Sequence, residues 1–277
     1  MSDPDPTPID RPDGRRAFGR DPDNYDEARP AYPGRVFELL RERCGLGQGT
    51  RVFEIGPGTG LATRPLLAAG ALVTAVEPDP RLAAYLGQHT PIDTLQIVAS
   101  PFEEANLPRA SFDLGCSATA FHWLDQRPAL AKVANLLRPG GSWAMWWNVF
   151  GDAERDDPFH EATKALLADL PMTPSQPLSW RHPFALDSVA RIDDMQSIGA
   201  FEDIAFETLN WTLQLDARQV RALYATFSHF SALEPAVRER LLERLYEIAA
   251  QDFAGRVERN MCTAIYTARR KSDRARD

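Results

Sequence analysis

The chain has 277 residues, 44% of them hydrophobic, which is enough for one large domain or a domain with a substantial insertion. Its formal net charge of −8 argues against a nucleic-acid-binding face, and because no run of about 18 apolar residues occurs, we expect no membrane span. The three cysteines, Cys44, Cys116 and Cys262, are far apart, so we expect no disulfide framework, no structural zinc site and a cytoplasmic location.

The first half of the chain alternates strand and helix patterns. Residues 1–16 are acidic and rich in proline, which predicts a disordered tail. Apolar runs and turn signals then predict five strands, at Thr50–Ile55, Ala71–Val76, Leu95–Ala99, Phe112–Ser117 and Ser142–Trp147. Helices are predicted at Tyr32–Cys44, Leu61–Ala69, Pro80–His89 and Asp125–Leu137, with a turn at Arg138–Gly141. This alternation is typical of a parallel sheet covered by helices on both faces.

After Asn148 the pattern changes. Helices are predicted at 155–170, at 186–199 and across Ala217–Phe253, where the helical pattern breaks near Pro235. Strands are predicted at Glu202–Leu215 and Asn260–Ala268. We therefore expect residues 151–277 to supply substrate-side helices and the last strands, with about 216–256 inserted between those strands, in the same single domain as the rest.

The most informative stretch is VFEIGPGTG, Val52–Gly60, in which an apolar strand runs into a glycine turn. Gly56, Gly58 and Gly60 follow G-x-G-x-G spacing, and residues without a Cβ let the backbone bend sharply and approach a ligand closely. Glu54 lies two residues before the first glycine. An acid that points at a ligand suits a cationic amino group better than a pyrophosphate.

A second acid follows at the end of the next predicted strand. Glu77 comes 21 residues after Gly56, about where a βαβ nucleotide fold presents a carboxylate to a ribose. A dinucleotide fingerprint would require a third glycine at position 61, which is Leu61. The spacing therefore favours a nucleoside ligand other than a dinucleotide.

The pattern E-x-G-x-G-x-G resembles motif I of the class I S-adenosylmethionine-dependent methyltransferases. Three further stretches resemble small-molecule members of the trans-aconitate methyltransferase type: YDEARPAYP at Tyr25–Pro33, FDLGCSATAFHWLD at Phe112–Asp125 and LLRPGGSWAMWW at Leu136–Trp147. The likeness is good over residues 18–150 and extends to the end of the chain only in layout.

The resemblance implies an α/β fold, a Rossmann-like doubly wound, mostly parallel seven-stranded sheet with helices on both faces and an inserted helical cap. It also implies N-terminal cap helices within residues 17–48 and a cofactor-binding core at residues 49–150.

The resemblance further implies S-adenosyl-L-methionine as the cofactor. In the family, motif I holds the methionine part, the acid after the second strand binds both ribose hydroxyls, and the next side chain packs on the adenine. The matching residues here are Glu54, Gly56, Pro57, Gly58 and Gly60 for motif I, then Glu77 and Pro78.

The family usually reads the adenine amino group with a polar residue after the third strand. The chain departs from this pattern, because the usual position falls at Ser100 or Pro101. We expect Phe102 to border the adenine with its backbone amide and ring, and Glu103 to be the acceptor.

The resemblance also assigns residues to the remaining parts of the cofactor. Ser117, Ala118 and Thr119 are expected to line the methionine side and the methyl group. Tyr25 and Arg29 resemble residues that close over the cofactor, and a bidentate bond from Arg29 could bind its carboxylate.

His122 is the candidate catalytic residue. It follows the fourth predicted strand, and an imidazole titrates near neutral pH, so it could act as general base toward a hydroxyl or amine; a structural histidine is the alternative. Candidate substrate contacts are Trp123, Trp147, Asn148 and His229. Core packing is the alternative for Trp147, and His229 can face substrate or solvent.

We therefore expect an enzyme that transfers a methyl group in line from S-adenosylmethionine to a small organic molecule, without a metal. Two alternatives stay open: an NAD-dependent oxidoreductase on a similar sheet, against which Leu61 counts, and a cofactor-binding protein without transfer activity. The expected partner is a small-molecule substrate, with no nucleic acid and no membrane, and the protein is expected to be a monomer or a homodimer.

Overall fold

The computed structural model describes residues 18–151, 155–168, 170 and 183–272, and the tail predicted at 1–16 lies outside this set. The chain divides into two compact units. The helical unit comprises Met1–Pro30, Asn148–Phe184 and Leu209–Cys262, and the sheet unit comprises Ala31–Trp147, Ala185–Thr208 and Thr263–Asp277.

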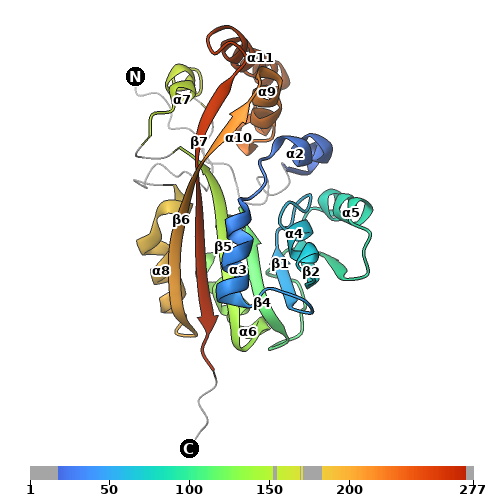
Figure 1. The fold of residues 1–277 in the computed structure, drawn as a ribbon. Coiled ribbons are helices and arrows are strands. Elements are labelled where there is room, and N and C mark those ends of the chain that lie inside the picture. The colour runs from blue at the N-terminus through green and yellow to red at the C-terminus, as the bar shows by residue number, and fades with distance from the viewer. Residues whose placement is uncertain (1–17, 152–154, 169, 171–182, 273–277) are drawn as a thin grey trace, which may run out of the picture. The chain divides into compact units, whose positions relative to one another are not determined.

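A seven-stranded sheet in the order β3-β2-β1-β4-β5-β7-β6 forms the framework (Figure 1). Its strands are β1 (Arg51–Ile55), β2 (Leu72–Glu77), β3 (Leu95–Ala99), β4 (Phe112–Ala118), β5 (Leu137–Phe150), β6 (Phe201–Leu215) and β7 (Val257–Arg270). The pairs β1–β2, β2–β3, β1–β4 and β4–β5 are parallel. The predicted Rossmann-like, mostly parallel seven-stranded sheet is confirmed.

The strand order reverses at β1. β2 and β3 follow on one side of β1, whereas β4 and β5 follow on the other. In open α/β sheets, ligands bind outside the carboxyl ends of the strands at such a reversal. The turns after β1, β2 and β4 are therefore where a ligand is expected.

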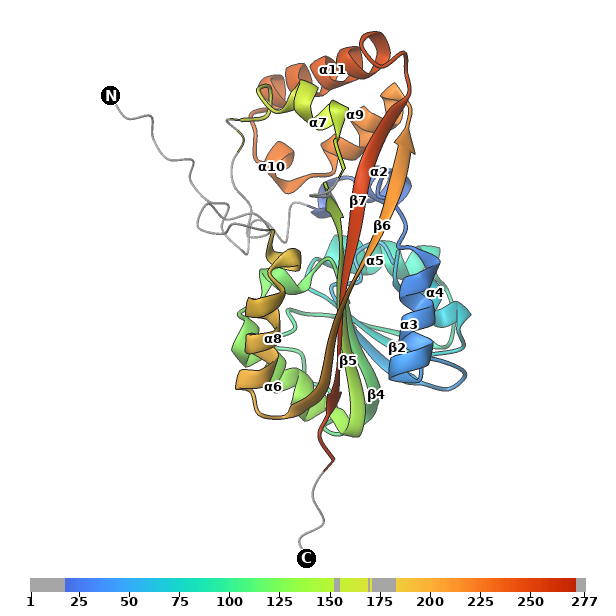
Figure 2. The same cartoon turned by 60° about the vertical axis from the view of Figure 1, so that its left-hand side comes forward.

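Helices cover both faces of the sheet within the sheet unit (Figure 2). One face carries α3 (Gly34–Cys44) and α4 (Thr63–Ala68), and the other carries α6 (Gln126–Leu136) and α8 (Ser188–Ser197). Helix α5 (Pro80–His89) begins where predicted, because the Asp79 carboxylate caps its first turn by accepting the Arg81 N–H. Short 3-10 turns occupy Phe121–Trp123 (η2) and Phe184–Leu186 (η3).

The helical unit has an apolar core of its own. It contains Phe18–Arg20 (η1), α2 (Pro22–Ala28), α7 (Pro158–Thr163), α9 (Ala217–Ala225), α10 (Ser228–Ser231) and α11 (Pro235–Gln251). Phe159, Val220, Leu223 and Leu245 are fully buried at the centre of this core. Beside it, Arg259 forms a buried ion pair with Asp157 and donates to the Tyr224 hydroxyl.

Two expectations about the helices were wrong in detail. The helix expected at 155–170 is only Pro158–Thr163 as far as the described residues show, because its N-cap is Asp157 and not an earlier residue. The helical stretch after Asp216 breaks near Pro235 as predicted, but it also breaks at Thr226–Phe227, where the Thr226 hydroxyl bonds the Leu223 carbonyl.

The turn predicted at Arg138–Gly141 is wrong. These residues lie within β5, where they form a bulge that shifts its register against β4. Phe112 pairs with Leu137 and Leu114 pairs with Ser142, so β5 has more residues between these two pairs than β4 has. A Cβ at Gly141 would lie 2.9 Å from the Arg138 carbonyl oxygen, which explains the glycine.

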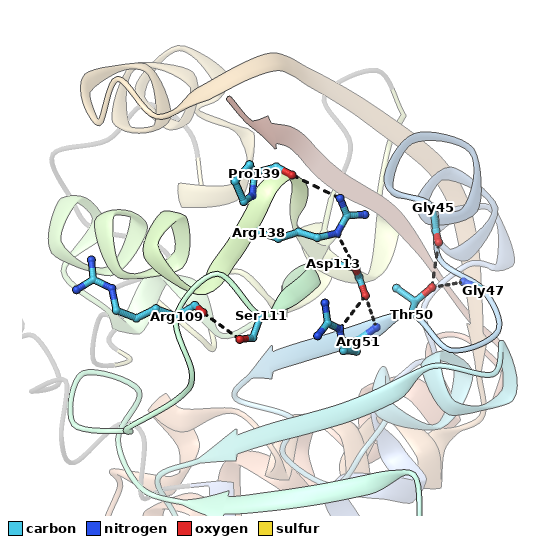
Figure 3. Close-up of polar contacts among 9 residues, drawn as sticks. All are labelled: Gly45, Gly47, Thr50, Arg51, Arg109, Ser111, Asp113, Arg138 and Pro139. Atoms are coloured by element: carbon cyan, nitrogen blue, oxygen red, sulfur yellow. Dashed lines mark hydrogen bonds and ion pairs between the residues drawn. The ribbon is translucent and has the colours of Figure 1, made fainter. Parts of the chain in front are cut away.

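The bulge is held by one carboxylate, that of Asp113 on β4 (Figure 3). Its Oδ1 accepts from Arg138 Nε at 2.5 Å, and its Oδ2 accepts from the Arg51 backbone N–H at 2.9 Å. The Thr50 hydroxyl fixes the turn before β1 by donating to the Gly45 carbonyl. Asp113 thus ties the amino-terminal ends of β1, β4 and β5 together.

Replacing this carboxylate should destabilise the sheet. We expect Asp113→Asn to lower the free energy of unfolding by roughly 1–2 kcal/mol at pH 7, because hydrogen bonds to a charged acceptor are lost. The pKa of Asp113 is lowered overall. Partial burial by itself would raise this pKa, but the hydrogen bonds from Arg138 and Arg51 have the larger effect. A lowered pKa means that the contribution is present above the unfolded value of about 3.9 and is lost as pH falls through the folded value.

Urea denaturation at pH 7 and at about pH 3 would measure this effect. The exposed Asp93→Asn is the matched control. An equal loss of stability at both pH values would contradict the role of the Asp113 charge.

Candidate functional site

The glycine turn after β1 has left-handed backbone at all three predicted glycines. The φ angles are 68° at Gly56, 59° at Gly58 and 100° at Gly60. A Cβ at Gly56 would lie 2.5 Å from the Ala120 Cβ, and one at Gly60 would lie 2.7 Å from Leu86. A Cβ at Gly58 would meet nothing within 4 Å. Packing against Ala120 therefore excludes a side chain at the first glycine, a Cβ at the third would require the end of the Leu86 side chain to shift, and the second faces open space.

Glu54 is buried at the end of β1, directly before this turn, with 0% of its surface exposed. Its Oε2 accepts a hydrogen bond from the Thr63 hydroxyl at 2.6 Å, and its Oε1 has no hydrogen-bond partner among the described residues. Burial raises the pKa of Glu54 to about 7, partly offset by the Thr63 bond and assisted by the charge of Glu77. A buried carboxylate oxygen without a partner is costly unless a ligand supplies a donor.

Glu77 ends β2 and is also buried, with 3% of its surface exposed. Its Oε2 accepts from the Gly58 N–H and its Oε1 from the Asp79 N–H, each at 3.0 Å. Burial raises its pKa to about 7, against the two backbone bonds. Each oxygen keeps further acceptor capacity, which a vicinal diol could use. Pro78, the next residue, is half-buried.

The end of β4 presents the three predicted residues to different surroundings. The Ser117 hydroxyl is buried and donates to the Ile55 carbonyl, so it ties β4 to β1. Ala118 and Thr119 are half-buried. Thr119 has φ 53°, a left-handed value that is rare for a β-branched residue, and its hydroxyl lies 2.9 Å from the Tyr32 hydroxyl.

Tyr32 is a residue of the site that the sequence reasoning missed. Its ring packs edge-on against Trp146 at 5.8 Å, and its hydroxyl holds Thr119. The signal was present in YDEARPAYP, Tyr25–Pro33, the segment in which only Tyr25 and Arg29 were singled out.

The loop after β3 places Phe102 and Glu103 differently. The Phe102 ring is 3% exposed and stacks on Phe53 at 6.2 Å, so it packs in the core and only its backbone amide can border a ligand. Glu103 is exposed. Its role as acceptor for the adenine stays a prediction.

His122 lies in η2 just after β4 and is 5% exposed. Its Nδ1 accepts a hydrogen bond of 3.0 Å from the Trp147 indole N–H on β5. In the neutral ring this bond places the proton on Nε2. Trp123 and Trp147, expected at the substrate, are 5% and 3% exposed. The neighbouring Trp143 and Trp146 are fully buried core residues.

The other predicted residues belong to the helical unit. The Arg29 guanidinium lies 5.1 Å from the Tyr25 ring centroid and 4.7 Å from that of Phe227, and it donates to the Thr226 carbonyl. Its Nε is buried without a hydrogen-bond partner among the described residues. Burial and the nearby Arg29 charge lower the pKa of His229 to about 4, so this imidazole is neutral at pH 7.

Asn148 donates from its amide to the Pro30 carbonyl at 3.3 Å, also within the helical unit. The expected roles of Tyr25, Arg29, Asn148 and His229 at the cofactor or the substrate stay predictions.

The described residues contain no group of three or more His, Cys, Asp or Glu side chains placed to hold a metal ion. In the same part of the chain, no helix is long and apolar enough to cross a membrane. Cys44, Cys116 and Cys262 are buried and form no disulfide within the described part of the chain.

Comparison with known sequences identifies one domain. Residues 53–145 match a family model described as a methyltransferase domain. An uncharacterised methyltransferase of Mycobacterium tuberculosis is 34% identical over 139 residues, which cover 50% of this chain and 55% of that protein. The matched segment thus spans about half the length of such curated relatives.

Comparison with solved structures identifies the fold. A putative type II methyltransferase from Anaeromyxobacter dehalogenans superposes with a TM-score of 0.59 at 22% identity, covering 88% of this chain and 99% of that one. Phosphoethanolamine N-methyltransferase 2 of Haemonchus contortus, in complex with S-adenosyl-L-methionine, gives 0.57 at 16% identity, covering 93% and 60%. The shared fold is that of the class I S-adenosylmethionine-dependent methyltransferases.

The residues of the sheet unit fit S-adenosylmethionine. The Oε1 of Glu54, which no described residue bonds, suits a cationic amino group. The open space at Gly58 leaves room for a ligand against the backbone, and the Glu77 carboxylate suits the ribose diol. These features lie around the turns after β1 and β2, where the strand order predicts a ligand site.

Gly56 and Gly58 should respond differently to an added methyl group. We expect Gly58→Ala to lose only about 1–2 kcal/mol of stability from its left-handed backbone, yet to bind S-adenosylhomocysteine at least about tenfold more weakly, because the methyl projects into the ligand space. Gly56→Ala adds a clash with Ala120 and should lose roughly 1–3 kcal/mol more stability. Denaturation and calorimetric titration would separate the two effects, and wild-type affinity in Gly58→Ala would contradict this placement of the ligand.

Cofactor affinity should rise with pH up to about pH 7.5. The buried Glu54 and Glu77 have raised pKa values of about 7, so each is stabilising in its neutral form and loses that contribution as pH rises through 7. Binding a cation and a diol favours both ionised forms. We expect S-adenosylhomocysteine to bind roughly 10- to 100-fold more tightly at pH 7.5 than at pH 5.5, with proton release below pH 7.

Calorimetry in buffers of different ionisation enthalpy would count the released protons. Glu77→Gln is the control, since it should weaken binding and flatten the pH dependence. An affinity that does not change with pH would show that these carboxylates do not face the ligand.

Proposed function

We propose that this chain, whose residues 53–145 belong to the methyltransferase domain family, transfers the methyl group of S-adenosylmethionine to a small organic molecule. The observation that carries the proposal is the pair of buried carboxylates around the glycine turn. Glu54 keeps one oxygen that no described residue bonds, and Glu77 bridges two backbone amides. This arrangement suits the charge and the diol of that cofactor.

The chemistry requires little more than orientation by the protein. When bound, the cofactor supplies a methyl group attached to a sulfonium. The neutral thioether that remains after transfer is a good leaving group. Glu54 would hold the amino group of the cofactor and Glu77 its ribose, while the rigid end of β4 at Thr119 would shape the space for the acceptor. Positioning of this kind is worth up to about 7–11 kcal/mol in favourable cases.

The charge of the chain supports a small acceptor. A net charge of −8 disfavours RNA and DNA, whose binding calls for a basic face. The likeness of three sequence stretches to the trans-aconitate methyltransferase type points the same way. The monomeric or homodimeric state and the cytoplasmic location stay predictions.

Methyl-labelled S-adenosylmethionine offered with a metabolite extract, with RNA and with protein would test the proposal. We expect the label to move into the metabolite fraction. Glu77→Ala should slow this transfer roughly 10- to 150-fold at low cofactor concentration, because its loss weakens cofactor binding by about 1.5–3 kcal/mol. Label found only in RNA or protein would overturn the small-molecule proposal.

The role of His122 can be tested once the product is known. Its Nδ1 is already the acceptor for Trp147, which supports a positioning role over the general-base role expected from the sequence. His122→Asn keeps an oxygen that can accept from Trp147, whereas His122→Ala does not. We expect Asn to keep most of the wild-type turnover and Ala to lose about tenfold, with cofactor affinity unchanged in both.

A general base would give a different result. Both variants would then lose about 10²–10⁴-fold in turnover, and the ionisation of an imidazole would disappear from the pH–rate profile.

A further inference from the structure

One lysine holds the loop that follows β3. Lys132 lies on α6, and its ammonium donates to the carbonyl oxygens of Phe102 at 2.6 Å, Glu103 at 3.1 Å and Ala105 at 2.6 Å. An ammonium has three N–H groups, so all of them are used on this one short segment. Such charge-assisted bonds are short and strong.

The loop itself forms a single turn. The Pro101 carbonyl accepts from the backbone N–H groups of both Glu104 and Ala105, each at 3.0 Å. In a turn of this type, the carbonyls point one way and the first N–H groups point the other way. Because the carbonyls face Lys132, the amide of Phe102 faces away from it, and no acceptor among the described residues bonds that N–H.

The same lysine also fixes the side chain of Phe102. Its ammonium lies 5.0 Å from the centroid of the Phe102 ring, which is buried and stacks on Phe53 of β1. A cation over an aromatic face is stabilising. The ring and the carbonyl of Phe102 are therefore both held, which leaves its amide with one orientation.

The register of the sheet places this loop beside the ribose carboxylate. Ala99, the last residue of β3, pairs with Glu77, the last residue of β2. A purine attached to a ribose at Glu77 therefore reaches the turn that starts at Ser100. Adenine presents a ring-nitrogen acceptor beside an amino donor, which matches an N–H donor followed by a carboxylate.

We propose that Lys132 is a positioning residue that orients the Phe102 amide toward the ring nitrogen at the adenine edge, and that it thereby sets the selectivity of the site for a 6-aminopurine. The proposal rests on the cofactor of the proposed function. It does not depend on the methyl acceptor, so a failure to find a methylated product would leave it untouched.

Paired calorimetric titrations with S-adenosylhomocysteine and with its 6-oxo analogue, S-inosylhomocysteine, would test the proposal. The 6-oxo purine reverses the donor and the acceptor at this edge. In the wild type we expect S-adenosylhomocysteine to bind at least about tenfold more tightly. Lys132→Met keeps the apolar stem but removes the ammonium, and it should lose about tenfold in affinity for S-adenosylhomocysteine with little change for the analogue.

Arg127→Met is the matched control, because Arg127 lies on the same helix with an exposed side chain and should keep the wild-type ratio. If Lys132→Met does not fold, Lys132→Gln retains an amide donor and should show a smaller ratio than the wild type. An unchanged ratio, or equal losses for both ligands, would overturn the proposal and leave Lys132 a structural residue. A wild type that binds neither ligand would overturn the cofactor assignment and this proposal together.

Discussion

A buried carboxylate that bridges two backbone amides joins the glycine turn to the end of β2. Glu77 accepts from the Gly58 N–H with one oxygen and from the Asp79 N–H with the other. Burying a carboxylate is costly, and two neutral donors offset only part of that cost, which is why its pKa is raised to about 7. Glu54, on the neighbouring strand, is also buried, accepts a single hydrogen bond, from the Thr63 hydroxyl, and has a pKa raised to about 7. The site therefore holds two carboxylates whose ionised forms a cationic, diol-bearing ligand would stabilise.

The opposite side of the site is shaped by close approach and backbone strain. The turn at Gly56 packs so closely against Ala120 that no side chain fits, and Thr119 adopts a left-handed conformation that costs about 1–2 kcal/mol. That conformation persists because the Tyr32 hydroxyl and the Trp146 carbonyl hold the residue from both sides. Strain of this kind concentrates where a protein shapes a ligand site. The site thus combines the two buried carboxylates, Glu54 and Glu77, with the rigid backbone at Gly56 and Thr119, all at the same end of the sheet.

The features predicted correctly from the sequence share a local cause. Gly56, Gly58 and Gly60 all have the left-handed backbone angles that favour glycine, and Glu77 is placed by the length of one strand, helix and strand. Where the cause was distant, the prediction was incomplete or wrong. The ring of Phe102 packs in the core on Phe53, and Lys132, 30 residues later, bonds the loop that carries it. The segment Arg138–Gly141 has the composition of a turn but becomes a bulge, because Asp113 on another strand holds it.

The sequence by itself determined the order of the strands and helices, the glycine turn and the two acids beside it, because hydrophobic period, turn chemistry and spacing along the chain are local properties. Only the tertiary structure decided which polar atoms are already paired. The Trp147 indole donates to His122 Nδ1, the Lys132 ammonium donates to the loop after β3, and one oxygen of Glu54 has no partner among the described residues. The physical reason is that a hydrogen bond depends on distance and direction in space, and residues far apart in the sequence meet only when the sheet has formed.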